Sequence, residues 1–376
     1  MAHVEDRRKV DTKVPYRGDV PWRARYRGPD GKERSQSFAR RVDAERWLRS
    51  VETTKDRGEW IDPSAGRRPF REYVTAWQES QVHRATTAAQ VESHLKNHVL
   101  PIFGDRAIAS IRPSEVQSWV KGRAEVLAPS TVEVVYRYLV AIFRAAAEDR
   151  VIAQSPCRGV KLPRQERRQV EPLAVEVVQA ITEAMPTRYR ALVTLAAGTG
   201  LRQGECFGLT VDRVDFLRRT LKVDRQMVLL PGGPPDFGPP KTQASYRTLP
   251  LPAVVVDALA AHLATYPAGE SGLIFTNDQG DPISRTRFSG VVWRPSLKAA
   301  KLEGAKFHDL RHFYASLLIR HGESVKVVQS RLGHASAAET LDTYSHLWPD
   351  SEDQTRAAVD EVLGAGAAWS RPEVGT

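Results

Sequence analysis

The chain has 376 residues, which is longer than a domain with a single hydrophobic core usually is. We therefore expect two or three domains. Its 55 Lys and Arg against 45 Asp and Glu give a net charge of +10, which favours a polyanionic partner. Two cysteines are too few for a disulfide framework or a thiolate metal cage and fit a reducing compartment. No apolar stretch is long enough to span a bilayer and the start lacks a signal-peptide core, so we expect a cytoplasmic protein without membrane contact.

The first 60 residues combine positive charge with the pattern of a small sheet. Residues 22–27 alternate arginine with small or aromatic side chains, residues 29–31 have turn chemistry, and residues 35–38 continue the strand pattern. This predicts two or three short strands, followed by a helix from about residue 43 to 55. Such a basic sheet suits a DNA groove, although the same alternation is typical of an ordinary solvated sheet face. The candidate DNA-binding residues here are Arg23, Arg25 and Arg27.

The following segment has helical periodicity. Residues 70–82, 86–104 and 130–149 are predicted helices, the second ended by Pro101 and Gly104 and the third begun by an N-cap at Ser130. Beyond it the pattern is mixed, because strand-like stretches and a Pro/Gly-rich loop interrupt the helices near residues 214–251. The predicted fold class is therefore mainly α with small β elements: a sheet with a helix, a central helical bundle and a mixed C-terminal domain.

Two segments rich in Pro and Arg define the predicted domain boundaries. One is the linker 62–69, and the other is the connector 155–172, which places a boundary near residue 165. The predicted domains are residues 1–62, 68–165 and 170–376. The charge of the connector suits either a solvated linker or a clamp on DNA. The candidate DNA-binding residues in it are Arg164, Arg167 and Arg168.

The segment KFHDLRHFYASLLIRHG, residues 306–322, is predicted to be an amphipathic helix. At 100° per residue its leucines and aromatic residues share one face, and His308, Arg311 and His312 lie roughly opposite. Such a face is usually only solvated, but it also brings imidazole and guanidinium groups together. Zinc hydrolysis is not favoured, because the metalloprotease motif needs a glutamate where Asp309 stands.

The next segment, residues 327–347, defines a turn between two helices. Gly333 is placed to end one helix, and Ser336 with Glu339 forms a capping box that starts the next. His334 therefore lies in a tight turn, and Tyr344 lies in the second half of the new helix. Because a tyrosine commonly buries its ring and leaves its hydroxyl in contact with solvent, the position of Tyr344 alone does not indicate a catalytic role.

The segment LAAGTGLRQGECFGL, residues 195–209, predicts a helix broken by Gly198 and Gly200. The break places Arg202 at a bend, beside Glu205. Neither the dinucleotide-binding fingerprint nor the phosphate-loop pattern is present, so nucleotide binding is not expected. The bend is better suited to directing an arginine.

Together these segments resemble the tyrosine recombinase, or phage integrase, family of the three-domain, arm-binding type. TGLRQGECFGL resembles its first catalytic box, and HDLRHFYASLLIRHG, VVQSRLGHAS and TLDTYSH resemble the second, in the family's order. Residues 68–165, with HVLPIFGDRAI, resemble the core-binding helical domain, and residues 1–62 more loosely resemble the arm-binding domain.

The resemblance implies a role for each matching residue. Four side chains are expected to surround the scissile DNA phosphate: Arg202, His308, Arg311 and His334. Tyr344 is the expected nucleophile, His308 its expected base and Lys241 the expected general acid, while Glu205 is a supporting acid. Lys222 remains an alternative to Lys241, because it also lies on the predicted hairpin.

The chemistry implied by the resemblance needs neither a metal nor ATP. Two arginines present paired N–H donors to the non-bridging phosphate oxygens, which a lysine cannot do. The tyrosine hydroxyl, a weak nucleophile at neutral pH, is activated by a base and by neighbouring cations. The family's 3′-phosphotyrosyl link retains the phosphodiester energy, so another strand's hydroxyl can reseal it.

The implied function is site-specific recombination that integrates, and also excises, a phage or mobile element. The implied partners are double-stranded attachment sites, three further copies in a tetramer on a four-way junction, a DNA-bending host factor and an excision directionality factor, in the bacterial nucleoid. A type IB topoisomerase or a resolution recombinase would use the same chemistry, and a DNA-binding protein without catalysis would share the charge. The tail around Val359, Val362 and Leu363 is expected to pack on its own domain or on a neighbouring subunit.

Overall fold

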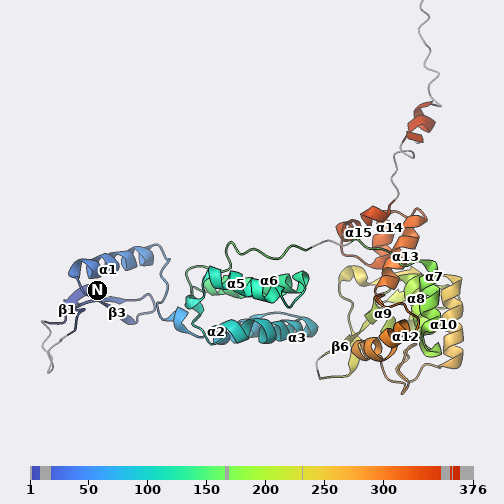
Figure 1. Ribbon diagram of the computed structural model, residues 1–376, viewed down its shortest axis with the longest axis horizontal. Helices are drawn as coiled ribbons and strands as arrows, with labels where there is room; N and C mark the ends of the chain where they lie inside the picture. Colours follow the sequence, from blue (N-terminus) through green and yellow to red (C-terminus); the bar gives the residue numbers. More distant parts are fainter. Residues whose placement is uncertain are drawn as a thin grey trace, which may run out of the picture. The chain divides into compact units, whose positions relative to one another are not determined.

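The computed structural model describes residues 2–8, 18–165, 169–230, 232–348, 356–357 and 359–364. The chain forms two compact units that divide between residues 166 and 167. Helices dominate both units and the strands are short, which confirms the mainly α prediction with small β elements (Figure 1). None of the described helices is long and apolar enough to cross a membrane.

The first unit begins with a three-stranded antiparallel sheet and one helix. The strands β1 (His3–Asp6), β2 (Trp22–Arg27) and β3 (Glu33–Phe38) pair in chain order, and α1 (Arg41–Asp56) packs on the sheet. Ala24 and Tyr26 of β2 are buried against α1 because alternate residues of a strand face the same side. The strands predicted at residues 22–27 and 35–38 are confirmed as β2 and β3, and the predicted helix is confirmed as α1. The sequence of β1 has no signal strong enough to predict a strand.

The rest of the first unit is a helical bundle with its own apolar core. Its helices are α2 (Phe70–Ser80), α3 (Ala85–His94), a π-helical stretch (Leu95–Val99), α4 (Leu100–Phe103), α5 (Pro113–Ala124) and α6 (Pro129–Glu148). Pro101 does not end the second predicted helix, because it lies in the first turn of α4, where its missing N–H is harmless, but Gly104 follows the last residue of α4 as its C-cap, as predicted. Ser130 is not the N-cap of α6; Ala128 is, with Pro129 as first residue.

The second unit combines helices with two small sheets. Its helices are α7 (Val175–Ala184), α8 (Thr187–Thr199), α9 (Gln203–Phe207), α10 (Ala253–Thr265), α11 (Arg285–Arg287), a π-helical stretch (Phe288–Trp293), α12 (Arg294–Ala299), α13 (Asp309–Arg320), α14 (Val325–Leu332) and α15 (Ala337–Tyr344). The strands β4 (Val214–Asp215), β5 (Thr220–Val223) and β8 (Arg247–Pro250) form one antiparallel sheet, and β6 (Gln226–Leu229) pairs with β7 (Pro235–Gly238). Part of the predicted Pro/Gly loop is thus the strand β7.

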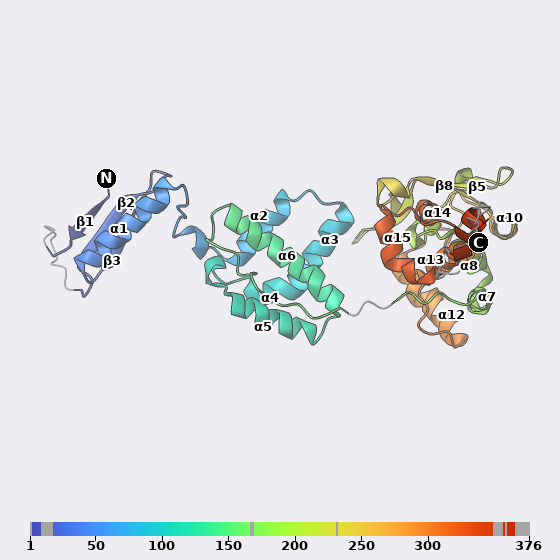
Figure 2. The same cartoon turned by 90° about the horizontal axis from the view of Figure 1, so that it is seen from above.

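The core of the second unit fixes the elements that carry the candidate site. The apolar side of α8 packs against α7, α10 and α13, and α14 packs between α13 and α15. Figure 2 shows α13, α14 and α15 side by side. In the tail, the described residues include one helical turn (Asp360–Gly364), on which Val362 and Leu363 are exposed.

Candidate functional site

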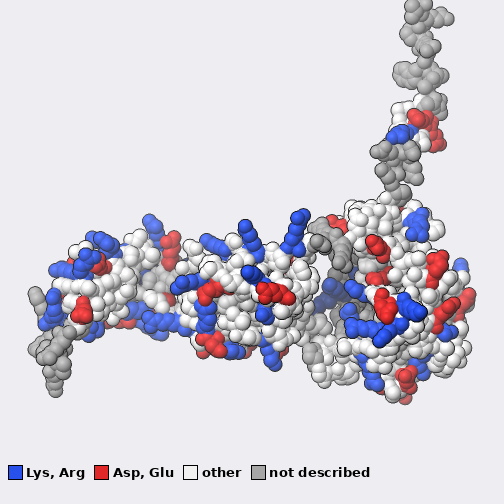
Figure 3. All heavy atoms as spheres, in the orientation of Figure 1, with Lys and Arg blue, Asp and Glu red and all other residues white. Residues whose placement is uncertain are grey.

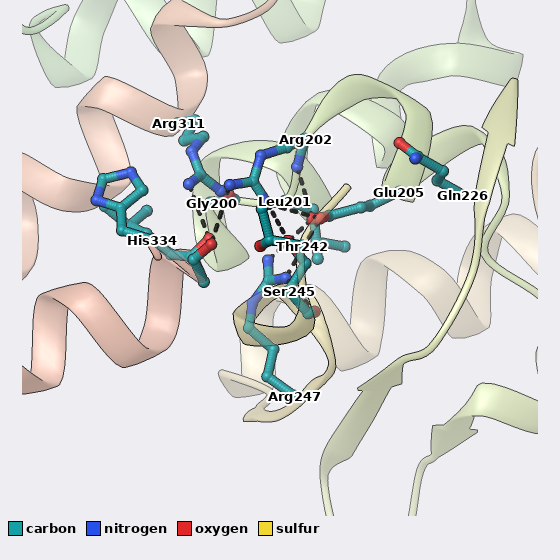
Figure 4. A network of polar contacts seen from close by, with 12 residues as sticks. Gly200, Leu201, Arg202, Glu205, Gln226, Thr242, Ser245, Arg247, Arg311 and His334 are labelled. Atoms are coloured by element: carbon teal, nitrogen blue, oxygen red, sulfur yellow. Dashed lines mark hydrogen bonds and ion pairs between the residues drawn. The ribbon is translucent and has the colours of Figure 1, made fainter. Parts of the chain in front are cut away.

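Arg202 lies at the junction of α8 and α9, where the chain turns sharply. Gly200 ends α8 with a left-handed φ of 65°, and a Cβ there would lie 2.4 Å from a ring carbon of Tyr314. Gly198, in contrast, stays inside α8 and does not break it. The Arg202 guanidinium donates to Ser245 Oγ at 3.1 Å (Figure 4). It also donates to the carbonyl of Gly333 at 3.0 Å.

Glu205 is a buried carboxylate that joins two arginines. It accepts from Arg202 Nη1 (3.0 Å) and from Arg247 Nη2 (2.9 Å), and it also accepts from the backbone N–H of Arg202 (2.9 Å). Burial alone would raise the pKa of Glu205, but the charges of Arg247 and Arg202 lower it. The carboxylate is therefore ionised and holds both guanidinium groups in place. The sequence predicted Glu205 as a supporting residue but missed Arg247.

Arg311 of α13 is buried, with 2% of its surface exposed, so it does not lie on a solvated polar face. It donates from Nη1 to the carbonyl of Gly200 (2.8 Å) and from Nη2 to that of Leu332 (2.7 Å). Burial and then repulsion from Arg202 lower its pKa to about 9. Arg202 donates to the carbonyl of Gly333 and Arg311 to that of Leu332. The two predicted arginines therefore contact the same turn at the end of α14.

That turn carries His334. Gly333 ends α14 in the left-handed conformation (φ 66°), as the sequence predicted. The His334 ring is buried and its Nδ1 lies 2.9 Å from Thr340 Oγ1. Burial and the charge of Arg311 lower the pKa of His334 to about 4, so the imidazole is neutral at neutral pH.

Tyr344 ends α15, whose N-cap Ser336 accepts from the backbone N–H of Glu339 as predicted. The tyrosine is 1% exposed, and its ring lies parallel to the His334 ring with centroids 6.4 Å apart. Burial raises its pKa to about 12. The hydroxyl of Tyr344 lies 2.8 Å from His312 Nδ1.

His308 and His312 lie one helical turn apart at the start of α13. Their rings meet edge to face with centroids 4.8 Å apart. The His308 side chain is exposed, yet partial burial of the ring and repulsion from His312 lower its pKa to about 4. His312 was identified in the sequence only as part of a polar face, and its contact with Tyr344 needed the relative placement of α13 and α15.

Lys241 shortly precedes Ser245, which accepts from Arg202, and its side chain is exposed. It follows β7 and precedes a 3-10 turn (Gln243–Ser245), and its neighbour Thr242 contacts Ser245 at 2.9 Å between hydroxyls. Within the described residues its amine makes no hydrogen bond. The amine of the alternative, Lys222 on β5, lies 3.7 Å from the carboxylate of Asp224.

The predicted DNA-binding arginines lie in the first unit or in the connector. Arg23, Arg25 and Arg27 point to the sheet face opposite α1 by strand alternation, and Arg25 is paired with Glu5 (2.9 Å) and Glu33 (2.7 Å). Arg164 is exposed, while Arg167 and Arg168 lie outside the described residues. Among the described residues no group of three or more His, Cys, Asp or Glu has the arrangement of a metal site.

Three protein-family descriptions match this chain. Residues 171–350 match the Phage integrase family, residues 21–57 its phage integrase N-terminal domain and residues 69–162 its central domain. The putative prophage phiRv2 integrase of Mycobacterium tuberculosis is 31% identical over 91% of this chain and 92% of its own length. A tyrosine recombinase XerC-like protein of Caldanaerobacter subterraneus is 28% identical over 74% of this chain and 79% of its own length.

Solved structures show the same fold. The Tn1549 transposon integrase in complex with transposon right end DNA covers 79% of this chain with a TM-score of 0.66 and 20% identity, and all of that chain is matched. A lambda integrase tetramer bound to a Holliday junction covers 88% of this chain and 93% of that one, with a TM-score of 0.58 and 19% identity. The chain belongs to the phage integrase family. It is a tyrosine-type site-specific DNA recombinase, of the kind that integrates phages or other mobile elements.

Proposed function

We propose that this recombinase cleaves each DNA strand with Tyr344 and holds the broken end as a 3′-phosphotyrosyl link. The observation that carries the proposal is the pairing of Arg202 and Arg311 on the carbonyls of residues 333 and 332, beside His334. A guanidinium has five N–H donors, and the contacts described above leave Nε of both arginines available. The two cations therefore form a clamp for the charge that develops on a phosphate.

Each remaining residue has one task in this proposal. His334 donates a hydrogen bond to a non-bridging oxygen, and Lys241 gives a proton to the leaving 5′-oxygen. His308, at the exposed N-terminus of α13, completes the polar wall around the phosphate. Because Tyr344 is buried, α15 has to shift before the hydroxyl reaches phosphorus. No metal or ATP takes part, since the arginines supply the charge and the phosphotyrosyl link retains the energy.

The proposed partners are DNA and further copies of the chain. Lys and Arg are spread over the visible faces of both units in Figure 3, which suits contact with phosphates along an extended DNA site. Arg23, Arg25 and Arg27 contact arm-type sites, and Arg164, Arg167 and Arg168 contact core DNA. By analogy with the lambda integrase tetramer on a Holliday junction, four copies exchange strands in pairs.

The protein is proposed to have three domains, residues 1–62, 68–165 and 170–376. In the tail, Val362 and Leu363 are exposed, which suits docking on a neighbouring subunit. A DNA-bending host factor and an excision directionality factor assist on the DNA of a bacterial nucleoid, in the cytoplasm.

A nicked suicide substrate tests the chemistry, because a cleaved strand that loses its 5′ end by diffusion traps the covalent adduct. Wild-type protein is expected to form the adduct, and Tyr344→Phe is expected to bind the same DNA without forming it. Adduct formation by Tyr344→Phe would remove Tyr344 as nucleophile. The alternative, a topoisomerase-like activity, predicts relaxation of supercoiled plasmid without recombination between two sites.

A further inference from the structure

The contact between His312 and Tyr344 assigns a role that the sequence gave to another residue. We infer that His312, rather than His308, takes the proton of the Tyr344 hydroxyl during cleavage. The inference rests on the proposed function, in which Tyr344 is the nucleophile. Its direct support is the 2.8 Å distance between His312 Nδ1 and the Tyr344 hydroxyl oxygen, which is a hydrogen bond of ordinary length.

Helix geometry decides between the two histidines. His308 and His312 lie one turn apart on α13, and the edge-to-face packing of their rings keeps them on the same side of the helix. His312 reaches the end of α15, whereas His308 remains exposed at the N-terminus of α13. A general base must lie within hydrogen-bond reach of the proton that it removes, and among the described residues His312 is in that position.

The surroundings of His312 keep its imidazole neutral and therefore able to accept a proton. On its own helix the titratable or charged neighbours of His312 are His308, Asp309 and Arg311. From α15 it contacts Tyr344, and the Tyr344 ring in turn stacks on the ring of His334. Burial lowers the pKa of His312, and Arg311 adds to this, while Asp309 opposes it. Since burial raises the pKa of Tyr344 to about 12, its hydroxyl rarely ionises at neutral pH without a base.

The proton follows one path in each direction. In cleavage the Tyr344 O–H bond breaks, Nδ1 of neutral His312 gains the proton, and the phenolate oxygen bonds to phosphorus as the P–O5′ bond breaks. The leaving 5′-oxygen is protonated by the general acid. In rejoining, the 5′-hydroxyl returns its proton to the general acid as its oxygen bonds to phosphorus, the P–O bond to Tyr344 breaks, and His312 returns the other proton to the phenolate.

The decisive variant is His312→Asn, because an amide keeps a hydrogen bond to Tyr344 but takes up no proton at neutral pH. We expect adduct formation on the suicide substrate to slow by roughly 10²- to 10⁴-fold, with DNA binding and thermal unfolding close to wild type. The residual rate is expected to rise with pH, since hydroxide then removes the proton. In His312→Ala, added imidazole is expected to restore part of the rate.

A substrate with sulfur in place of the bridging 5′-oxygen separates a base from an acid, because a thiolate leaves without a proton. The defect of His312→Asn is expected to persist on this substrate, whereas that of Lys241→Ala is expected to disappear. The control His321→Asn changes an exposed histidine at the end of the same helix and should cleave at the wild-type rate.

Two results would overturn the inference: cleavage by His312→Asn at the wild-type rate and with the wild-type pH profile, or full rescue of this variant by the bridging sulfur. Either result leaves the proposed function intact as long as Tyr344→Phe forms no adduct. Adduct formation by Tyr344→Phe, in contrast, would remove both.

Discussion

Arg247 donates from Nη2 to Glu205 Oε2 at 2.9 Å, and both side chains are buried. The same guanidinium donates to the carbonyl of Arg331 (2.8 Å), at the end of α14. The pair therefore links β8 to α9 and to the helix that precedes His334. A buried charge is tolerated only when it is paired and hydrogen-bonded, so this ion pair makes the shape of the site dependent on both partners.

Glu205→Gln is expected to destabilise the protein, because it leaves Arg247 buried without a charged partner. The loss should be about 3 kcal/mol in the free energy of unfolding, measured by urea denaturation at pH 7. Glu303→Gln, an exposed carboxylate in the same unit, should change the free energy little. Equal, small effects of both substitutions would show that the buried pair contributes nothing specific.

Arg202→Lys is expected to impair cleavage far more than DNA binding. Lysine keeps the charge but cannot donate to Glu205, Ser245 and the Gly333 carbonyl together and still face a phosphate. We expect roughly 10²- to 10³-fold slower adduct formation, the range for losing one donor to developing charge. Arg218→Lys, in an exposed turn of the same unit, is the matched control. An equal loss of binding and cleavage would argue against a clamp on the transition state.

Gly333→Ala is expected to lower both stability and cleavage. An alanine at its φ of 66° costs about 1–2 kcal/mol, and its Cβ would also lie 3.0 Å from the Ala244 carbonyl oxygen. Gly322→Ala is the matched control, because its φ is 81° but its Cβ would meet nothing within 4 Å. We predict that Gly322→Ala loses stability alone, in thermal unfolding and suicide-substrate assays run side by side. A Gly333→Ala protein that cleaves normally would show that the turn can shift without harming the site.

Acid is expected to destabilise the protein through His334. Its pKa is about 4 in the folded protein against about 6.5 in the unfolded chain, so the unfolded state binds more protons between these values. Stability should therefore be fully present above about pH 6.5 and should fall as the pH falls towards 4. His334→Asn should flatten this part of the curve of unfolding free energy against pH, and the exposed His321→Asn should not. An unchanged slope in His334→Asn would place the acid sensitivity elsewhere.

Local sequence signals predicted much of the fold. The apolar repeat of residues 130–149 gave a helix that matches α6 almost to its ends, and glycine chemistry at position 333 fixed the end of α14. Errors occurred where two signals competed: Pro101 suggests a helix end, yet it also fits the first turn of a new helix. The strand β1 was missed because its four residues are short and polar and depend on pairing with β2.

The candidate site was predictable as a set of residues but not as an arrangement. The motifs that resemble the family implied Arg202, Arg311, His334 and Tyr344, which the structure brings together in one unit. They gave neither the burial of Arg311 nor the contact of Tyr344 with His312, since both depend on how α13 packs against α14 and α15. Periodicity placed Arg311 on the face opposite the core. In the structure Arg311 is buried there and donates to the carbonyls of Gly200 and Leu332.

Mass spectrometry of the trapped covalent complex tests the central claim most directly. After nuclease and protease digestion, the account predicts one peptide carrying a 3′-phosphoryl nucleotide on the Tyr344 oxygen. Fragmentation should place the modification on that side chain and not on Tyr314, the buried tyrosine of α13. A nucleotide on any residue other than Tyr344, or complete cleavage without a covalent peptide, would contradict it.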